Sequence, residues 1–165
     1  MERTLVILKP DTIQRGLMGE IIARFEKAGL KIVGVKMASP DEAHYHHHYE
    51  TISKIISRHN QVVFDRIIKF MMSGPVIVAV LEGVEAVSLV RKLVGDTEPK
   101  SALPGTIRGD YAHINYKQAD AADIGIPNLV HASADIKEAK QEINHWFGPK
   151  ELFGYKTAHD HLTQA

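Results

Sequence analysis

The order of short apolar runs and amphipathic segments along the chain predicts one domain of mixed α and β structure. Two observations carry this prediction: β-rich runs bounded by turn residues, and apolar residues at helical spacing between those runs. The order favours a parallel α/β sheet, although a split βαβ arrangement with an antiparallel sheet gives a similar order. The 165 residues suffice for a single domain with its own core, which we expect to span 1–165.

Apolar, β-rich runs predict four strands, at 4–8, 31–37, 76–81 and 128–131. The first ends where Pro10 forces the chain out of regular pairing. The run VIVAVL at 76–81 is unbroken and bounded by turn residues, which makes it the clearest strand of the chain.

Apolar residues at helical spacing predict helices at 18–28, 62–72, 84–94 and 135–147. Asp135 and Glu138 stand at the spacing of a capping box, which indicates where the last of these helices begins. The segment 41–60 is also typical of a helix. Residues 95–110 show no periodicity of either kind, and a long loop of this type in a compact domain is usually functional or disordered.

The composition excludes several classes of protein. Lys and Arg together number 20, as do Asp and Glu, so the chain lacks the cationic excess that binds a nucleic-acid backbone. The absence of cysteine excludes a disulfide framework, a thiolate zinc site and a cysteine nucleophile, and it suits a reducing compartment. No apolar run approaches the ~20 residues that span a bilayer. We therefore expect a cytoplasmic protein with no membrane and no nucleic-acid partner.

The common phosphate-binding motifs are absent, since the chain has neither a P-loop nor a GxGxxG after its first strand. Side chains must therefore hold any bound phosphate. Arg91, Thr97 and Arg108 lie in and beside the loop 95–110, and guanidinium forks and hydroxyls suit phosphate oxygens. Each arginine taken singly is better interpreted as an ordinary surface cation.

One histidine lies where an apolar strand meets the start of a helix. His131 stands in the sequence NLVHASAD, and unpaired backbone N–H groups at a helix start favour an anion beside it. Glu142 lies at the border of the apolar stripe of the following helix, where it could accept a hydrogen bond from one imidazole nitrogen. The other nitrogen would then be the nucleophile. A buried structural histidine beside a capping Ser133 is an equally good interpretation.

A second group of histidines lies at 44–48 and has the spacing of a helical metal site. His44 and His48 are four residues apart, and His44 and His47 are three apart. No second group of carboxylates or histidines with ligand spacing accompanies them, so we interpret the segment as a solvated helix face.

Several separate motifs, in order along the chain, resemble those of the nucleoside diphosphate kinase family. The stretch VILKPDTIQRGLMGEIIARFEKAG resembles the first strand, lysine and first helix of the family, and MSGPV at 72–76 resembles its SGPV turn. The sequence GDTEPKSALPGTIRGD resembles the long loop of the family, and NLVHAS resembles its active-site signature. The resemblance runs from Thr4 to about Tyr155, which is most of the chain.

The resemblance implies an α+β fold, a ferredoxin-like βαββαβ sandwich with an antiparallel sheet, extra helices and the long loop at 95–110. It implies transfer of the γ-phosphate of a nucleoside triphosphate, mainly ATP, to a nucleoside diphosphate, with Mg²⁺ and little base selectivity. The transfer would follow a ping-pong mechanism through a phosphohistidine at His131. A homo-oligomer is also implied, with a hexamer favoured.

The resemblance also implies a role for individual residues. His131 would be phosphorylated, Glu142 would orient it with support from Ser133, and Lys9 and Tyr45 would flank the transferring phosphate. The nucleotide-binding residues would be Lys9, Val63 or Phe64, Arg91, Thr97, Arg108 and Asn128. No metal ligand is assigned.

Three features depart from the family pattern. Ala134 occupies the place where the family usually has an aspartate, with Asp135 next to it. The usual pair of aromatic residues at the base is Val63-Phe64 here, and extra residues lie at 46–61 and 111–127.

Two other classes of function remain open. One is a nucleotide-binding regulatory or assembly protein that has lost catalytic turnover. The presence of His131, Lys9 and Arg108 argues against a loss of turnover. A histidine-rich metal-binding module is the other, and it depends on 44–48 alone.

Overall fold

The computed structural model describes residues 1–158 and 160–163, so the predicted span 1–165 includes three residues outside this description. Four strands form one antiparallel sheet in the order β2-β3-β1-β4. Their bounds are Glu2–Leu8 (β1), Lys31–Ala38 (β2), Val76–Gly83 (β3) and Val130–Ala132 (β4). This order is that of a ferredoxin-like βαββαβ fold. The parallel alternative is therefore wrong, because an alternating order of strands and helices does not record strand direction.

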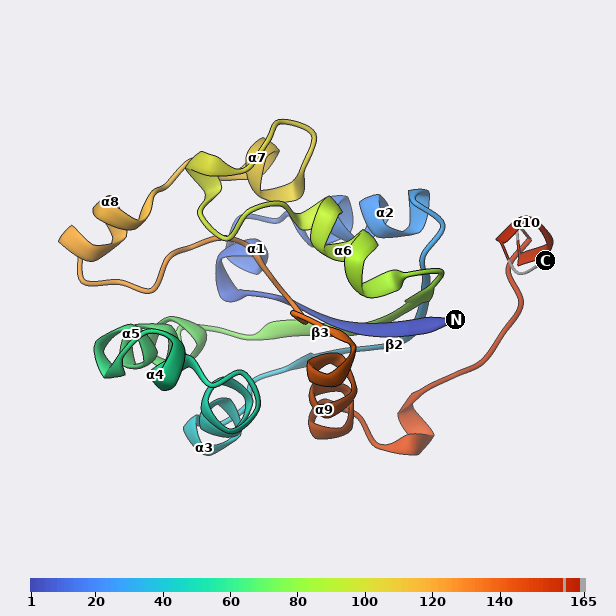
Figure 1. Cartoon of the computed structure of the whole chain (residues 1–165), viewed down its shortest axis with the longest axis horizontal. Helices are drawn as coiled ribbons and strands as arrows, with labels where there is room; N and C mark the ends of the chain where they lie inside the picture. The colour runs from blue at the N-terminus through green and yellow to red at the C-terminus, as the bar shows by residue number, and fades with distance from the viewer. Residues whose placement is uncertain (159, 164–165) are drawn as a thin grey trace.

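Helices cover both faces of the sheet (Figure 1). Helices α2 (Met18–Lys27) and α6 (Ala86–Val94) pack on one face, and α5 (Gln61–Met71) and α9 (Ile136–Trp146) pack on the other. Successive residues of β1 alternate between two cores, so that Val6 faces the first layer of helices and Ile7 the second. Burial on both faces explains why residues 5–8 of β1 are continuously apolar.

The four helices predicted from apolar spacing correspond to α2, α5, α6 and α9. At the start of α9, the side chain of Asp135 accepts a hydrogen bond from the N–H of Glu138 over 2.7 Å. The Glu138 carboxylate accepts from the N–H of Ala134 and not from that of Asp135. Half of the predicted capping box therefore forms.

The segment 41–60 is not one helix. It forms α3 (Glu42–His46), a π-helix η1 (His47–Ile52) and α4 (Ile55–Arg58), with Lys54 in the left-handed region at φ 57°. Wide π-helical turns are frequent at functional sites. This one lies against α9, and its His48 is fully buried, so the prediction of a solvated face is wrong for His48.

The region 95–127 carries short helices that apolar spacing does not predict. They are η2 (Pro99–Ser101), α7 (Ile107–Tyr111) and α8 (Tyr116–Ala121). Short segments also occur as α1 (Pro10–Gln14), η3 (Pro149–Glu151) and α10 (Asp160–Thr163). In the described residues, no helix has both the length and the apolar character needed to cross a membrane.

Candidate active site

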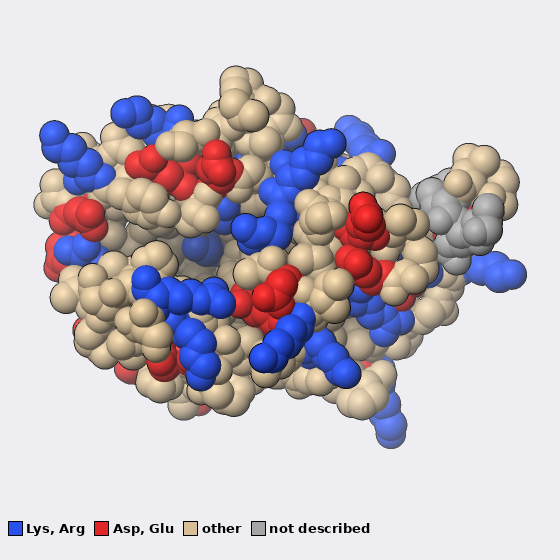
Figure 2. Space-filling view, viewed as in Figure 1, with Lys and Arg blue, Asp and Glu red and all other residues tan. Residues whose placement is uncertain are grey.

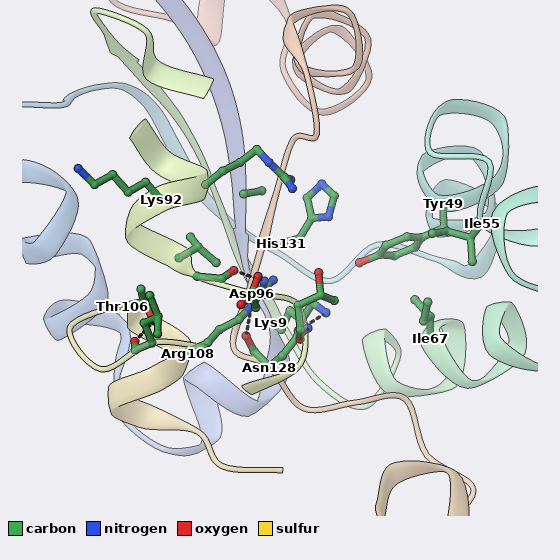
Figure 3. A pocket seen from close by; sticks show the side chains of 16 residues that line it. Lys9, Tyr49, Ile55, Ile67, Lys92, Asp96, Thr106, Arg108, Asn128 and His131 are labelled. Atoms are coloured by element: carbon green, nitrogen blue, oxygen red, sulfur yellow. Dashed lines mark hydrogen bonds between the residues drawn. The ribbon is translucent and has the colours of Figure 1, made fainter. Parts of the chain in front are cut away.

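A cavity of about 410 Å³ opens between α6, α7, η1 and the end of β4 (Figures 2 and 3). Figure 2 shows it as a hollow with lysine and arginine side chains inside and around it. Six residues predicted from the sequence line it: Lys9, Arg91, Thr97, Arg108, Asn128 and His131. The fold thus brings together residues that lie more than 100 positions apart in the chain.

His131 and Glu142 form a hydrogen-bonded pair at this cavity. His131 pairs with Ile7 in the sheet, and its Nε2 lies 2.7 Å from Oε1 of Glu142, which is fully buried on α9. A carboxylate only accepts, so Nε2 of a neutral His131 carries the proton and Nδ1 keeps its lone pair. The other carboxylate oxygen accepts from Ser133 Oγ at 2.5 Å. The pair therefore leaves Nδ1 with a free lone pair at the cavity.

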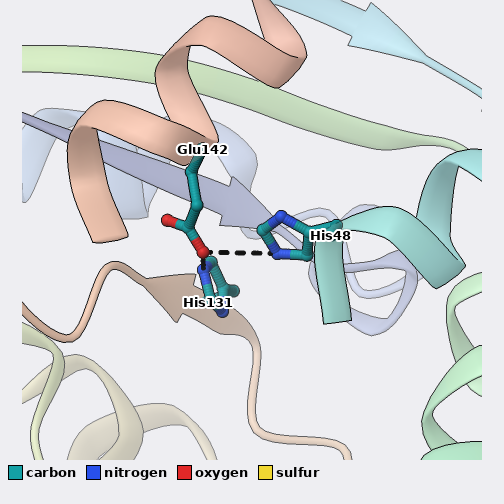
Figure 4. A group of neighbouring side chains, drawn as sticks. All are labelled: His48, His131 and Glu142. Carbon is teal, nitrogen blue, oxygen red and sulfur yellow. Dashed lines mark hydrogen bonds and ion pairs between the residues drawn. The ribbon is translucent and has the colours of Figure 1, made fainter. Parts of the chain in front are cut away.

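A second imidazole faces the same carboxylate (Figure 4). Nε2 of His48 lies 3.6 Å from Oε1 of Glu142, and Nδ1 of His48 accepts from the indole of Trp146 at 3.2 Å. Burial, with smaller contributions from neighbouring His131, His145 and His44 and from Lys9, lowers the pKa of His48 well below its usual range. A neutral His48 whose Nδ1 accepts must carry its proton on Nε2, facing Glu142.

His48, His131 and Glu142 also have the spacing of a metal site, because one ligand atom from each lies within 4.8 Å of the others. Among the described residues no other such group of three occurs. The hydrogen bonds disfavour a cation there, since both Nε2 atoms point protons at Glu142 and metal ligation needs lone pairs.

Lys9 and Asn128 lie at the bottom of the cavity (Figure 3). The Lys9 ammonium donates to Oδ1 of Asn128 at 2.7 Å, and Nδ2 of Asn128 donates to the carbonyl of Thr97 at 2.8 Å. Burial and the neighbouring Arg108 lower the pKa of Lys9 to about 8. The charge of this lysine is thus poorly solvated and suited to pairing with an anion.

Arg108 is buried and braces the backbone around the cavity. Its guanidinium donates to the carbonyls of Gly95, Asn128 and Val130 at 2.9, 3.1 and 2.6 Å. These bonds use three of its five N–H groups and leave two for a ligand. Arg91, by contrast, is exposed at the rim.

Tyr45 does not lie in the cavity, which contradicts its predicted position. Its ring is 1% exposed and packs in the core near Trp146. Tyr49 lines the cavity instead, with its ring centroid 6.1 Å from that of His131. Tyr49 lies in the π-helix next to β4, whereas Tyr45 precedes it on α3. Tyr45 and Tyr49 lie about one helical turn apart in the run HYHHHYE. This spacing is the only feature of the sequence that makes Tyr49 an alternative to Tyr45.

A second, more apolar cavity of about 350 Å³ adjoins the first and shares four lining residues with it: Lys9, Ile67, Thr97 and Asn128. Val63 lines this second cavity, whereas Phe64 is 5% exposed and belongs to the core. Phe64 therefore does not line this cavity, because its position on α5 directs its ring into the core beside the sheet.

Helix α8 and the turn after it form a wall of the second cavity and are fixed to α5 by ion pairs. Arg66 Nη1 contacts Asp120, and Arg66 Nε contacts Asp123, both at 2.7 Å. The extra residues at 111–127 therefore build part of the cavity wall.

A carboxylate-held imidazole in a cationic cavity on a ferredoxin-like sheet fits a phosphotransferase. The family model described as "Nucleoside diphosphate kinase" matches residues 2–152. The chain belongs to the nucleoside diphosphate kinase family.

Relatives and solved structures agree with this assignment. The chain is 44% identical to a nucleoside diphosphate kinase of Borreliella burgdorferi over 94% of its own length and 93% of the relative's. It is 48% identical to that of Pyrococcus horikoshii, over 96% and 93% of the two chains. A Borrelia burgdorferi structure described as a transition-state mimic with vanadate and ADP superimposes with a TM-score of 0.95 at 42% identity, covering 99% and 96% of the two chains. A Halobacterium salinarum enzyme in complex with CDP gives 0.83 at 39% identity, covering 98% and 97%.

Proposed function

We propose that the chain transfers the γ-phosphate of a nucleoside triphosphate, chiefly ATP, to a nucleoside diphosphate through a phosphohistidine at Nδ1 of His131. The observation that supports this most strongly is the 2.7 Å contact between His131 Nε2 and Glu142 Oε1, because it leaves Nδ1 unprotonated at the cavity.

The lone pair of Nδ1 attacks the γ-phosphorus, and the bond from that phosphorus to the β–γ bridging oxygen breaks. The nucleoside diphosphate leaves with the electron pair, while the proton on Nε2 of His131 stays hydrogen-bonded to Glu142. A terminal β-phosphate oxygen of a second diphosphate then attacks the phosphorus, and the N–P bond breaks. Both half-reactions use one cavity in turn, which gives ping-pong kinetics.

Positioned cations and donors stabilise the charge of the transferring group. Lys9, Arg91, Thr97 and the two remaining N–H groups of Arg108 hold phosphate oxygens. The hydroxyl of Tyr49 is buried without a partner, and burial raises its pKa above the usual value, so it stays a donor. Tyr49 rather than Tyr45 therefore flanks the phosphate.

The cavity suits a magnesium ion that enters with the nucleotide. Mg²⁺ is typically bound by one or two carboxylates together with substrate phosphates and waters. Asp96 is the one carboxylate among the residues lining the main cavity, and it is exposed there. Ala134 offers no ligand, and Asp135 and Glu138 cap the start of α9. When bound, the ion neutralises phosphate charge, and Asp96 would hold it.

The second cavity suits the nucleoside base, and Asn128, shared by both cavities, suits the ribose. Val63, Ile67 and Phe70 offer mainly apolar contact to a base. Apolar contact discriminates weakly between bases, which favours broad specificity.

We also propose a homo-oligomer, with a hexamer favoured, in which the sheet edge is covered. Strand β2 is an edge strand, and its Val35 and Met37 are 54% and 57% exposed. Exposed apolar side chains on an edge strand favour pairing with another copy. Sedimentation at several protein concentrations tests this: a monomer at all of them would contradict it.

Labelling with ATP that carries radioactive γ-phosphate tests the proposed nucleophile. We expect an acid-labile label on the wild type, none on His131→Ala, and full transfer of the label to added diphosphates. His113→Ala is the matched control, because His113 is exposed outside the main cavity. Label that persists on His131→Ala would refute the nucleophile, and nucleotide binding without any label would favour the regulatory alternative.

A further inference from the structure

The backbone is strained immediately before β4. Leu129 is fully buried, yet its φ is +70°, in the left-handed region that leucine rarely occupies. The N–H of Val130 donates to the carbonyl of Asn128 over 2.8 Å, which closes a three-residue γ-turn around Leu129. A γ-turn with positive φ is rare and strained, so surrounding contacts must hold it.

Residues 9–12 supply those contacts. Oδ2 of Asp11 accepts from the N–H of Leu129 at 3.1 Å. The carbonyl of Leu129 accepts from Oγ1 of Thr12 at 2.6 Å and from the backbone N–H of Lys9 at 2.8 Å. Both backbone groups of the strained residue are therefore bound by one short segment that follows β1.

The γ-turn separates two residues of the site. Asn128, on one side, holds the Lys9 ammonium, and His131, on the other, pairs with β1. A change in the φ of Leu129 would rotate Asn128 and His131 relative to each other. Errors of about 1 Å in such groups can slow a reaction ~100-fold.

We propose that Asp11 is a positioning residue whose carboxylate holds the γ-turn at Leu129 and thereby sets Asn128 and His131 for phosphoryl transfer. The inference deepens the proposed function and rests on it. Asp11 acts here as a hydrogen-bond acceptor. Because it also faces Lys9 and raises the pKa of that lysine, its charge has a second effect that an experiment must separate.

The first experiment separates the hydrogen bond from the charge. Asp11→Asn keeps an oxygen acceptor for the N–H of Leu129 and removes the charge, whereas Asp11→Ala removes both. We expect single-turnover phosphorylation of His131 to be slowed roughly 10- to 100-fold in Asp11→Ala and only about threefold in Asp11→Asn. Equal losses in the two variants would overturn the role of the hydrogen bond.

The second experiment tests the strain with a matched pair. Leu129→Ala and Leu129→Gly leave cavities of nearly equal size, but only glycine adopts positive φ without cost. In the Asp11→Ala background, we expect the glycine variant to phosphorylate about tenfold faster than the alanine variant. A glycine variant no faster than the alanine variant would overturn the inference.

Thr12→Val and Thr12→Ser provide a test that does not depend on how well the Asp11 variants fold. Valine has the shape of threonine without the hydroxyl, so it should slow phosphorylation several-fold more than serine does. Circular dichroism reports folding of each variant. If the proposed function is wrong, the wild type will carry no label. In that case we compare the affinity for ADP, which depends on Asn128, between the two variants of each pair. Equal ADP affinities within each pair would overturn the inference in that case.

Discussion

The indole Nε1–H of Trp146 donates a hydrogen bond to Nδ1 of His48 over 3.2 Å. This bond fixes the tautomer of His48 and turns its Nε2 proton toward Oε1 of Glu142, 3.6 Å away. The same oxygen receives the Nε2 proton of His131. His48 therefore faces the carboxylate that His131 contacts, from an element that lies more than 80 residues earlier in the chain.

Replacing His48 by phenylalanine keeps an aromatic ring and removes both ring nitrogens. We expect phosphorylation of His131 to slow by up to about tenfold, because Glu142 loses a polar neighbour 3.6 Å from its Oε1. Rapid-quench labelling measures this rate, and ADP affinity should change little. His47→Phe is the control, because His47 is exposed. Equal rates in the two variants would show that His48 does not influence Glu142.

Replacing Glu142 by alanine leaves the imidazole of His131 without its acceptor. We expect phosphorylation to slow by roughly 100-fold, while the affinity for ADP falls less than about threefold, since Glu142 does not line the cavity. Glu142→Gln, which keeps an acceptor oxygen without the charge, should lie between alanine and wild type. An unchanged phosphorylation rate would remove the orienting role of Glu142.

The sequence predicts the elements whose contacts are local. His131, Ser133 and Glu142 belong to one strand, one turn and one helix, so the spacing along that helix suffices to bring the carboxylate to the imidazole. The run at 4–8 is likewise recognisable because β1 is buried on both faces. In these places, local pattern and tertiary structure agree.

The sequence does not predict what depends on long-range packing. His48 and Tyr49 reach the site because a π-helix interrupts 41–60 and packs against α9, which no apolar period records. The strand directions were also undetermined by the residue pattern, and the resemblance to a family supplied them. Arg108 donates to the carbonyl of Gly95 and to those of Asn128 and Val130, which belong to two separate segments. The sequence of the loop 95–110 alone therefore does not predict that Arg108 holds the backbone around the cavity.

His44 should make the stability of the fold depend on pH. It stacks on His145 with ring centroids 3.8 Å apart, and its Nε2 is buried without a partner. Burial, then the nearby His145 and more weakly His47 and Lys36, lower its pKa to about 4, against a smaller opposing effect of Asp41. Between pH 6.5 and pH 4, His44 is therefore protonated in the unfolded chain but stays neutral in the folded chain.

The contribution of His44 to stability is complete above pH 6.5 and is lost progressively as the pH falls toward 4. His44→Leu keeps an apolar contact with His145 and removes the titration. We expect its Tm to fall less between pH 6.5 and pH 4 than that of the wild type, by roughly a few degrees. His46→Leu, on an exposed residue, is the control. Parallel Tm profiles for His44→Leu and the wild type would contradict the prediction.

We expect Lys9 to destabilise the unliganded protein, although the reaction requires this lysine. Its ammonium is buried beside Arg108, and its pKa falls to about 8 from 10.5, so it is charged in both the folded and the unfolded protein at pH 7. We expect Lys9→Met to raise the stability at pH 7 by about 1–2 kcal/mol, after allowing for the lost bond to Asn128, and to abolish phosphorylation. Between pH 8 and pH 10.5 only the folded lysine is neutral, so the wild type gains stability and the difference shrinks. Thermal unfolding at pH 7 and pH 10 measures both effects, with Lys92→Met at the exposed rim as the control. A lower Tm of Lys9→Met at pH 7 would mean that the buried charge is stabilised by its surroundings before any phosphate binds.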